Sequence, residues 1–301
     1  MSMSLALLHT GAQASLSAFS VHPSTVIGIL GLAGLYEFEA RRTRRDSSST
    51  DGTAVATGVP PRGVLSNDVS PTIGQRWLYY SGLVAMFLSL NGPLHDLSDS
   101  YLFSAHMIQH LMLSLVVAPL MVMGTPGGML RPALKYRGVR PLAEWLTKPT
   151  HTFVIYIAIM AGWHLPPMYN YALAHHNVHI VEHLMFLVAS VLMWWPVLSP
   201  MPELPRLSYP GQMLYMFLLT IPMAIIAVYI AYADQLLYPI YATAPRIWGI
   251  TPMNDQLIGG LIMWIPGGLY FYTVISFVFF KWQQRDGIES QAGAQVNWHP
   301  T

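Results

Sequence analysis

The sequence predicts an all-α polytopic membrane protein, a bundle of seven transmembrane helices. Of its 301 residues, 53% are hydrophobic and only 10% are charged, and the mean hydropathy is +0.42. A soluble domain carries about 25% charged residues, so this chain lacks the polar surface that it would need in water. Aromatic residues make up 12% of the chain, with 9 Trp and 16 Tyr, which suits rings that lie at bilayer interfaces.

Seven apolar stretches account for the predicted helices. A helix needs about 20 mostly apolar residues to cross the hydrocarbon core of a bilayer. Prolines lie within or near the ends of several stretches, which membrane helices tolerate when neighbouring groups satisfy the freed carbonyls. The predicted spans are 21–39, 76–91, 106–124, 151–165, 179–198, 210–232 and 256–280.

The segment between the first two spans differs from the rest of the chain. It is rich in Ser, Thr, Gly and Pro and begins with a basic run, which is typical of a disordered linker. The N-terminus lacks the positively charged region of a signal peptide, so we expect it to be retained. The predicted organisation is an extracytoplasmic segment 1–20, a first helix 21–39, a cytoplasmic linker 40–75, a six-helix membrane core 76–280 with an outward-facing histidine cluster, and a cytoplasmic tail 281–301.

Lysine and arginine predict the orientation, because cytoplasmic loops carry an excess of both. With seven spans, all 15 basic residues except Arg246 fall on one face. The N-terminus is therefore predicted outside and the C-terminus in the cytoplasm. The net charge of +1 gives no reason to expect a nucleic-acid partner.

The histidines have the opposite distribution. Of the 12 histidines, all except His151 and His299 lie on the outer side or in the outer ends of predicted helices. HMIQH at 106–110 and HHNVHIVEH at 175–183 each place two imidazoles four residues apart, on one side of a helix. Two such pairs could together offer four nitrogens to one metal ion: His106, His110, His179 and His183. No metal-binding role is assigned to His9, His22, His151 and His299.

Residue chemistry narrows the choice of metal. The absence of cysteine excludes disulfides, thiolate zinc sites and iron–sulfur clusters. Imidazole suits Zn, Cu, Fe and Ni, while thioether selects Cu(I), so a His and Met mixture outside the cytoplasm favours copper, with zinc as the alternative. His164 and His95 are the next predicted ligands. Glu182 and Asp255 are predicted as carboxylate ligands or as acceptors that fix ring tautomers. Possible extra ligands are His175, His176, Met107, Met168 and Met185.

Two other functions remain open. The sequence from His179 to His183 is H-x-x-E-H, a pattern in which two histidines bind zinc and Glu182 would activate water. This hydrolase hypothesis leaves the second histidine pair without a purpose. A bis-histidine haem is the other hypothesis, although two i,i+4 pairs at one end of a bundle suit a small ion better than a flat macrocycle.

Five motifs occur in an order that resembles the CtaG family, multi-span membrane proteins required to assemble caa-type cytochrome c oxidase. They are LHDLSDSYLFSAHMIQHLML (94–113), GWHLPPMYNYAL (162–173), VHIVEHLMF (178–186), MWWPVL (193–198) and NDQLIGGLIMWIPGG (254–268). The resemblance covers about 76–280. The family positions that this chain supplies are His95, His106, His110, His164, His179, Glu182, His183 and Asp255.

The resemblance implies a role in oxidase maturation without a catalytic step. The protein would receive copper from an extracytoplasmic donor and pass it by ligand exchange to cytochrome c oxidase subunits within the lipid bilayer. The expected location is the bacterial cytoplasmic membrane. No catalytic residue is expected under this hypothesis.

Overall fold

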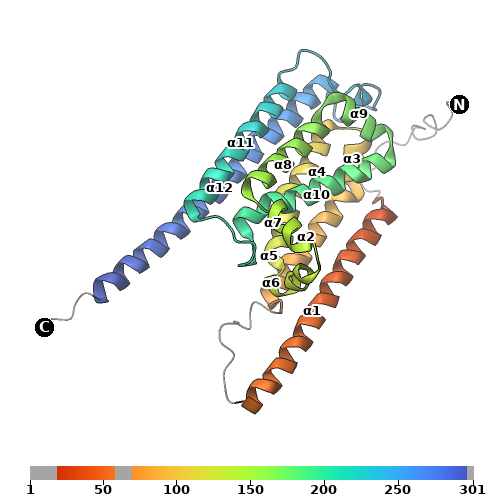
Figure 1. Ribbon diagram of the computed structural model, residues 1–301. Helices are drawn as coiled ribbons and strands as arrows, with labels where there is room; N and C mark the ends of the chain where they lie inside the picture. Colours follow the sequence, from red (N-terminus) through yellow and green to blue (C-terminus); the bar gives the residue numbers. More distant parts are fainter. Residues whose placement is uncertain (1–18, 58–69, 297–301) are drawn as a thin grey trace.

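The computed structural model describes residues 19–57 and 70–296, and the regular structure in these residues is entirely helical. Figure 1 shows long helices packed side by side, with α1 at one edge of the bundle and α11 and α12 at the other. The long helices are α1 (Pro23–Thr57), α2 (Ile73–Leu90), α8 (Pro149–His164), α10 (His176–Leu198), α11 (Tyr209–Ala231), α12 (Pro252–Val296), and a continuous run through α4 (Phe103–Leu111), the π-helix η2 (Met112–Val117) and α5 (Ala118–Gly124).

Four helical segments within the described residues are long and apolar enough to cross a membrane. They are Phe103–Gly124, His176–Leu198, Tyr209–Ala231 and Pro252–Asp286. These segments coincide with the third, fifth, sixth and seventh predicted spans. The other three predicted spans lie in α1, α2 and α8, so every predicted span is helical. The count of seven spans and the orientation stay predictions.

Two helices run further than the sequence predicts. α1 continues past residue 39 to Thr57, so the first part of the predicted linker 40–75 is helical, and residues 58–69 lie outside the described part. Tyr36, Ala40 and Thr43 are buried on one face of α1, which holds this helix against the bundle beyond the apolar stretch. α12 likewise continues past residue 280 into the predicted tail and ends at Val296.

Short helices lie at both ends of the bundle. One end holds α3 (Gly92–Ser100), α9 (Pro166–Ala174) and η4 (Pro239–Tyr241). Tyr241 donates from its hydroxyl to the Ser98 carbonyl at 2.7 Å, which fastens η4 to α3. The other end holds α6 (Gly127–Leu130), η3 (Arg131–Lys135) and α7 (Val139–Leu146), where Arg131 pairs with Glu203 at 2.8 Å. The basic residues between 131 and 148 therefore lie away from α3 and α9.

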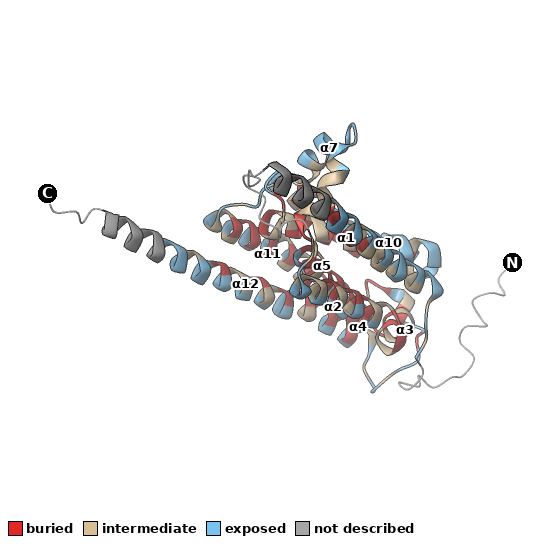
Figure 2. Ribbon diagram, turned by 90° about the horizontal axis from the view of Figure 1, so that it is seen from below, coloured by how far each residue is buried: buried red, intermediate tan, exposed pale blue. Residues whose placement is uncertain are grey.

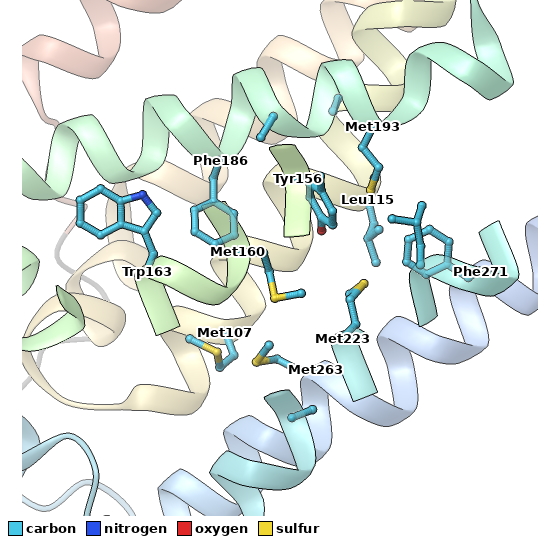
Figure 3. Packing of buried hydrophobic residues seen from close by; sticks show 14 of the residues in the cluster. Met107, Leu115, Tyr156, Met160, Trp163, Phe186, Met193, Met223, Met263 and Phe271 are labelled. Atoms are coloured by element: carbon cyan, nitrogen blue, oxygen red, sulfur yellow. The ribbon is translucent and has the colours of Figure 1, made fainter. Parts of the chain in front are cut away.

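The interior and the exterior of the bundle are both apolar. Figure 2 shows buried residues along the inward helix faces and exposed residues along the outward ones. In the interior, Met107, Met160, Met223 and Met263 lie near one another (Figure 3), where flexible thioethers fill irregular space between helices. On the outside of the bundle, large apolar side chains are exposed, and Phe277, for example, is 70% exposed. A surface that faces the hydrocarbon of a bilayer requires such side chains.

Candidate metal centre

The two histidine pairs meet inside the bundle. His106 and His110 project from α4 with ring centroids 4.2 Å apart, and His179 and His183 project from α10 at 4.3 Å. Across the helices, the centroids of His106 and His179 are 5.4 Å apart, and those of His110 and His183 are 5.5 Å apart. The i,i+4 spacing stacks each pair on one helix face, and the packing of α10 against η2 and α5, which continue α4, brings the pairs together.

Glu182 lies at the centre of this group. One carboxylate oxygen, Oε1, is 3.8 Å from Nε2 of His106 and 3.8 Å from Nε2 of His110, and Oε2 is 4.0 Å from Nε2 of His179. A tetrahedral ion with bonds of about 2.0–2.1 Å holds its ligand atoms roughly 3.4 Å apart. The spacing between Glu182 and these nitrogens is thus close to that of ligands around one ion, and too long for direct hydrogen bonds.

Many polar atoms of this centre are buried and have no hydrogen-bond partner among the described residues. Burying a polar group without a hydrogen bond costs a few kcal/mol, so native proteins pair nearly all of them. A bound cation would take one nitrogen of each imidazole together with the carboxylate oxygens, and we therefore consider that the residues fit a metal ion. Within the described residues, the unpaired atoms of the centre are both ring nitrogens of His106, His110 and His183, Nε2 of His164 and His179, and both oxygens of Glu182.

His164 joins the centre from the end of α8. Its Nδ1 lies 2.6 Å from the Met160 carbonyl oxygen, so this nitrogen carries the proton and donates. Nε2 then keeps its lone pair and is buried, which is the state of a metal-ligating imidazole. The ring centroid is 5.8 Å from that of His110.

His95 lies beside the centre on α3, but its ring nitrogens already have partners. The Gln109 amide nitrogen is 3.0 Å from Nδ1 of His95 and 2.8 Å from the Ser89 carbonyl oxygen, so it donates to both. Nδ1 of His95 is therefore an acceptor, and the proton lies on Nε2, which faces Asp99 at 3.4 Å. In this arrangement His95 positions Asp99 instead of offering a lone pair to the ion.

Asp99 is a site residue that the sequence analysis did not select. Its Oδ2 is 3.5 Å from Nδ1 of His179, and it groups with His106 and His179 as ligand atoms within 4.8 Å of one another. Burial raises the pKa of Asp99 to about 7 and lowers the pKa of His95 to about 3. The i,i+4 spacing of His95 and Asp99 on a short helix is the signal that could have identified this residue.

Asp255 does not reach the imidazoles. Its carboxylate accepts hydrogen bonds from the backbone N–H groups of Phe103 at 2.6 Å and Ser104 at 3.1 Å, and from the Ser104 hydroxyl at 2.5 Å. The two backbone donors are free N–H groups at the start of α4. Asp255 therefore holds the N-terminus of the helix that carries His106 and His110, in place of the predicted roles as ligand or tautomer-fixing acceptor.

Of the possible extra ligands, all except His176 lie away from the centre. His175 precedes α10, is exposed, and has its Nδ1 2.8 Å from the Tyr171 carbonyl oxygen, and Met168 is 47% exposed. Met107 and Met185 pack in the hydrophobic core, on other helix faces than the neighbouring histidines. His176 is exposed and lies at the edge of a cavity that borders the centre. Of the histidines that the sequence analysis left without a role, His9 and His299 lie outside the described residues. Among those described, the structure brings His22 close, with its ring 4.3 Å from that of His95.

A break in the regular helix follows His110. Six residues form the π-helix η2, a rare element found often at functional sites. In a π-helix the N–H of position 119 would bond the Ser114 carbonyl, but Pro119 has no N–H. Trp194 donates from Nε1 to this Ser114 oxygen at 2.8 Å and so satisfies it. The contact ties α10 to the α4 chain just beyond the centre.

The fold and the site together define a helical protein with membrane-length apolar helices and a buried histidine–carboxylate centre. The profile of the cytochrome c oxidase caa3 assembly factor family (Caa3_CtaG) matches residues 61–285. The chain therefore belongs to this family, as the resemblance predicted.

Three curated mycobacterial proteins match the chain. Uncharacterized proteins of Mycobacterium bovis and Mycobacterium tuberculosis are each 26% identical to this chain over 230 residues, which cover 71% of this chain and 35% of the relative. An uncharacterized protein of Mycobacterium leprae is 22% identical over the same coverage. The chain thus spans about a third of the length of the curated relatives it matches. No solved structure matches the chain.

Proposed function

We propose that this protein binds copper at the buried centre and passes it to cytochrome c oxidase during oxidase assembly. The proposed ligands are His106, His110, His179 and His183, with His164 and Glu182 completing the set. The copper is cargo, so the reaction is ligand exchange and no residue acts as a catalyst.

One observation carries the proposal: buried imidazole nitrogens and a buried carboxylate converge without hydrogen-bond partners. Glu182 and His106 are each 0% exposed, and Glu182 lies within 4.0 Å of three imidazole nitrogens. A protein interior tolerates such a group when an ion satisfies it. Imidazole donors with a carboxylate and no thiolate suit copper or zinc, and the oxidase family favours copper.

The number of donors supports transfer over permanent storage. Copper and zinc need about four ligands, while the centre offers five histidines and two carboxylates, Glu182 and Asp99. Surplus ligands allow an ion to change partners one bond at a time without becoming free. The family membership supports cytochrome c oxidase subunits as recipients, an extracytoplasmic protein as donor, and the bacterial cytoplasmic membrane as location.

The zinc hydrolase is the second candidate, because the H-x-x-E-H residues are all present at the centre. A hydrolytic Glu182 would have to stand beside a metal-bound water. Its carboxylate instead lies among the imidazole nitrogens at ligand spacing, which favours a role as ligand. The haem alternative has less support, because Glu182 lies between the two histidine pairs where a macrocycle would need space.

Metal analysis of the purified protein tests the proposal. The full chain in mild detergent is compared with the double variant His110→Ala/His183→Ala and with a control, His151→Ala, whose ring contacts Trp145 at the opposite end of the bundle. We expect about one copper per chain in the wild type and control, and none in the double variant. Zinc in place of copper would favour the hydrolase, and equal copper in all three samples would refute the site.

A further inference from the structure

A cavity leads from the buried centre towards the edge of the bundle. Its volume is about 220 Å³. The cavity lies between α1 and α10, and residues of α2 and α3 also line it. Imidazoles line its polar part, and side chains such as Ile29, Leu32 and Leu187 line its apolar part. The histidines of the lining are His22, His95, His176, His179 and His183.

An aromatic layer closes another side of the centre. Tyr169 packs 5.1 Å from His106, and its hydroxyl is 2.8 Å from that of Tyr241. Phe103 stacks on Tyr238 at 4.5 Å, and each of these four aromatic residues is at most 3% exposed. An ion has no room to pass between such closely packed rings. The cavity beside α1 is therefore the better route to His179 and His183.

Hydrogen bonds that do not use the imidazole ring fix His22 beside this cavity. The His22 backbone N–H donates to the Asn91 Oδ1 at 2.7 Å, and the Gly92 N–H donates to the Ser20 carbonyl at 2.8 Å. Ser20 also donates from its hydroxyl to Asp96 at 2.5 Å. Three hydrogen bonds thus fasten residues 20–22 to the junction of α2 and α3.

Gly92 makes this attachment possible. Its φ is +68°, a conformation that favours glycine, and a Cβ at this position would lie 2.5 Å from a ring carbon of Phe19. The local backbone is therefore shaped to let residues 19–22 approach α3 closely. The result is that the rings of His22 and His95 meet in a T-shaped arrangement, with an interplanar angle of 84°.

One ring nitrogen of His22 is available to an ion in the tautomer that carries its proton on Nδ1. Its Nε2 is buried and, among the residues that the structure describes, has no hydrogen-bond partner. His22 and His176 line the mouth of the same cavity that His179 and His183 line inside. We propose that His22 is a relay ligand, through which copper enters and leaves the centre between α1 and α10.

The relay step is a ligand exchange that leaves the oxidation state of the ion unchanged. A copper–nitrogen bond to His22 forms as a bond to His179 or His183 breaks on the way out, and each imidazole keeps its own lone pair. His176, exposed at the cavity edge, receives the ion next. This inference rests on the proposed copper function, and adds the route by which the ion moves.

The rate of copper extraction tests the relay. The full chain in detergent, loaded with one equivalent of copper as Cu(I) or Cu(II), is mixed with excess coloured chelator and followed by stopped-flow absorbance. The variants are His22→Ala and His22→Phe, and the control is His175→Ala, an exposed histidine that does not line the cavity. The anchoring bond uses the His22 backbone, so both variants keep the attachment of residues 20–22.

We expect extraction and loading to be about tenfold slower in both His22 variants, with bound copper per chain unchanged, because the exchange path lacks one ligand. The control should behave as the wild type does. Wild-type rates in both variants would overturn the relay, and faster extraction in His22→Ala would identify His22 as a steric plug instead. A wild-type protein that binds no copper would refute the proposed function itself.

Discussion

At the scale of single residues, the centre depends on a carboxylate surrounded by imidazoles. Glu182 is fully buried, and in the described part of the chain its oxygens have no lysine, arginine or hydrogen-bond donor beside them, only imidazole nitrogens at 3.8–4.0 Å. A buried carboxylate in such a place is costly unless a cation compensates it. The same residue separates the copper and hydrolase hypotheses, because one requires a ligand and the other a base.

Replacing Glu182 with Gln keeps the shape and removes the charge. We expect copper affinity to fall about 10–100-fold, since an anionic oxygen near the ion is lost. Competition against a chelator of known affinity measures the change. Glu203→Gln is the control, because Glu203 pairs with Arg131 at the opposite end of the bundle. Unchanged affinity in Glu182→Gln, together with loss of a hydrolytic activity, would favour the hydrolase.

At the scale of elements, α4 is positioned at both of its ends by groups from other helices. Asp255 on α12 binds the free N–H groups at its start, and Trp194 on α10 binds the Ser114 carbonyl beyond its end. His106 and His110 lie between these two attachments. The metal centre therefore depends on residues that do not touch it.

The substitution Asp255→Asn removes the negative charge at the start of α4 and one of its acceptors. We expect a loss of about 1 kcal/mol in stability, as for other helix N-terminal acceptors, while the copper content per chain stays the same. Thermal unfolding in detergent measures the loss. Asn254→Ala, at an exposed neighbouring position, should leave the midpoint unchanged, and a loss of copper in Asp255→Asn would instead indicate a ligand.

The substitution Trp194→Phe removes the donor that satisfies the Ser114 carbonyl. The buried carbonyl is left unpaired, which costs about 1–3 kcal/mol, so the thermal midpoint should fall. Trp195→Phe is the matched control, since Trp195 is less buried and donates to Leu204 at the longer distance of 3.2 Å. Equal midpoints for the two variants would contradict the role given to the π-helix.

At the scale of the whole molecule, the two ends differ in chemistry. Buried histidines gather at the end that holds α3 and α9, while Arg131, Lys135 and the basic residues that follow lie at the end that holds α6 and α7. If the basic end faces the cytoplasm, the candidate metal centre opens towards the outer side of the membrane, where the proposed function places the handling of copper.

Single cysteines test this orientation cleanly because the chain has none of its own. Asn177→Cys places a thiol at the exposed start of α10, and Glu144→Cys places one on the exposed surface of α7. With intact cells and a membrane-impermeant thiol reagent, we expect labelling of the first variant alone. Both should label after the membrane is disrupted, and the reverse pattern in intact cells would invert the predicted topology.

Much of this arrangement follows from local sequence patterns. Apolar runs predict the helices because each run must bury its backbone polar groups within one segment in a bilayer. The i,i+4 spacing in HMIQH and in HIVEH predicts two imidazole pairs, and the structure places both pairs in contact. The continuation of α1 past residue 39 was not predictable in this way, because the burial of Ala40 and Thr43 against the bundle depends on contacts with other segments and not on apolar periodicity.

By itself, the sequence determined the helical class, the family and the four histidines at the heart of the centre, because composition and i,i+4 spacing act within one segment. Only the tertiary structure decided which neighbours join them. In the structure, Asp255 caps the start of α4 and Met107 packs in the hydrophobic core. Asp99 and His22 lie beside imidazoles of the histidine cluster. These roles depend on which helix faces meet, and that is set by packing between segments far apart in the chain.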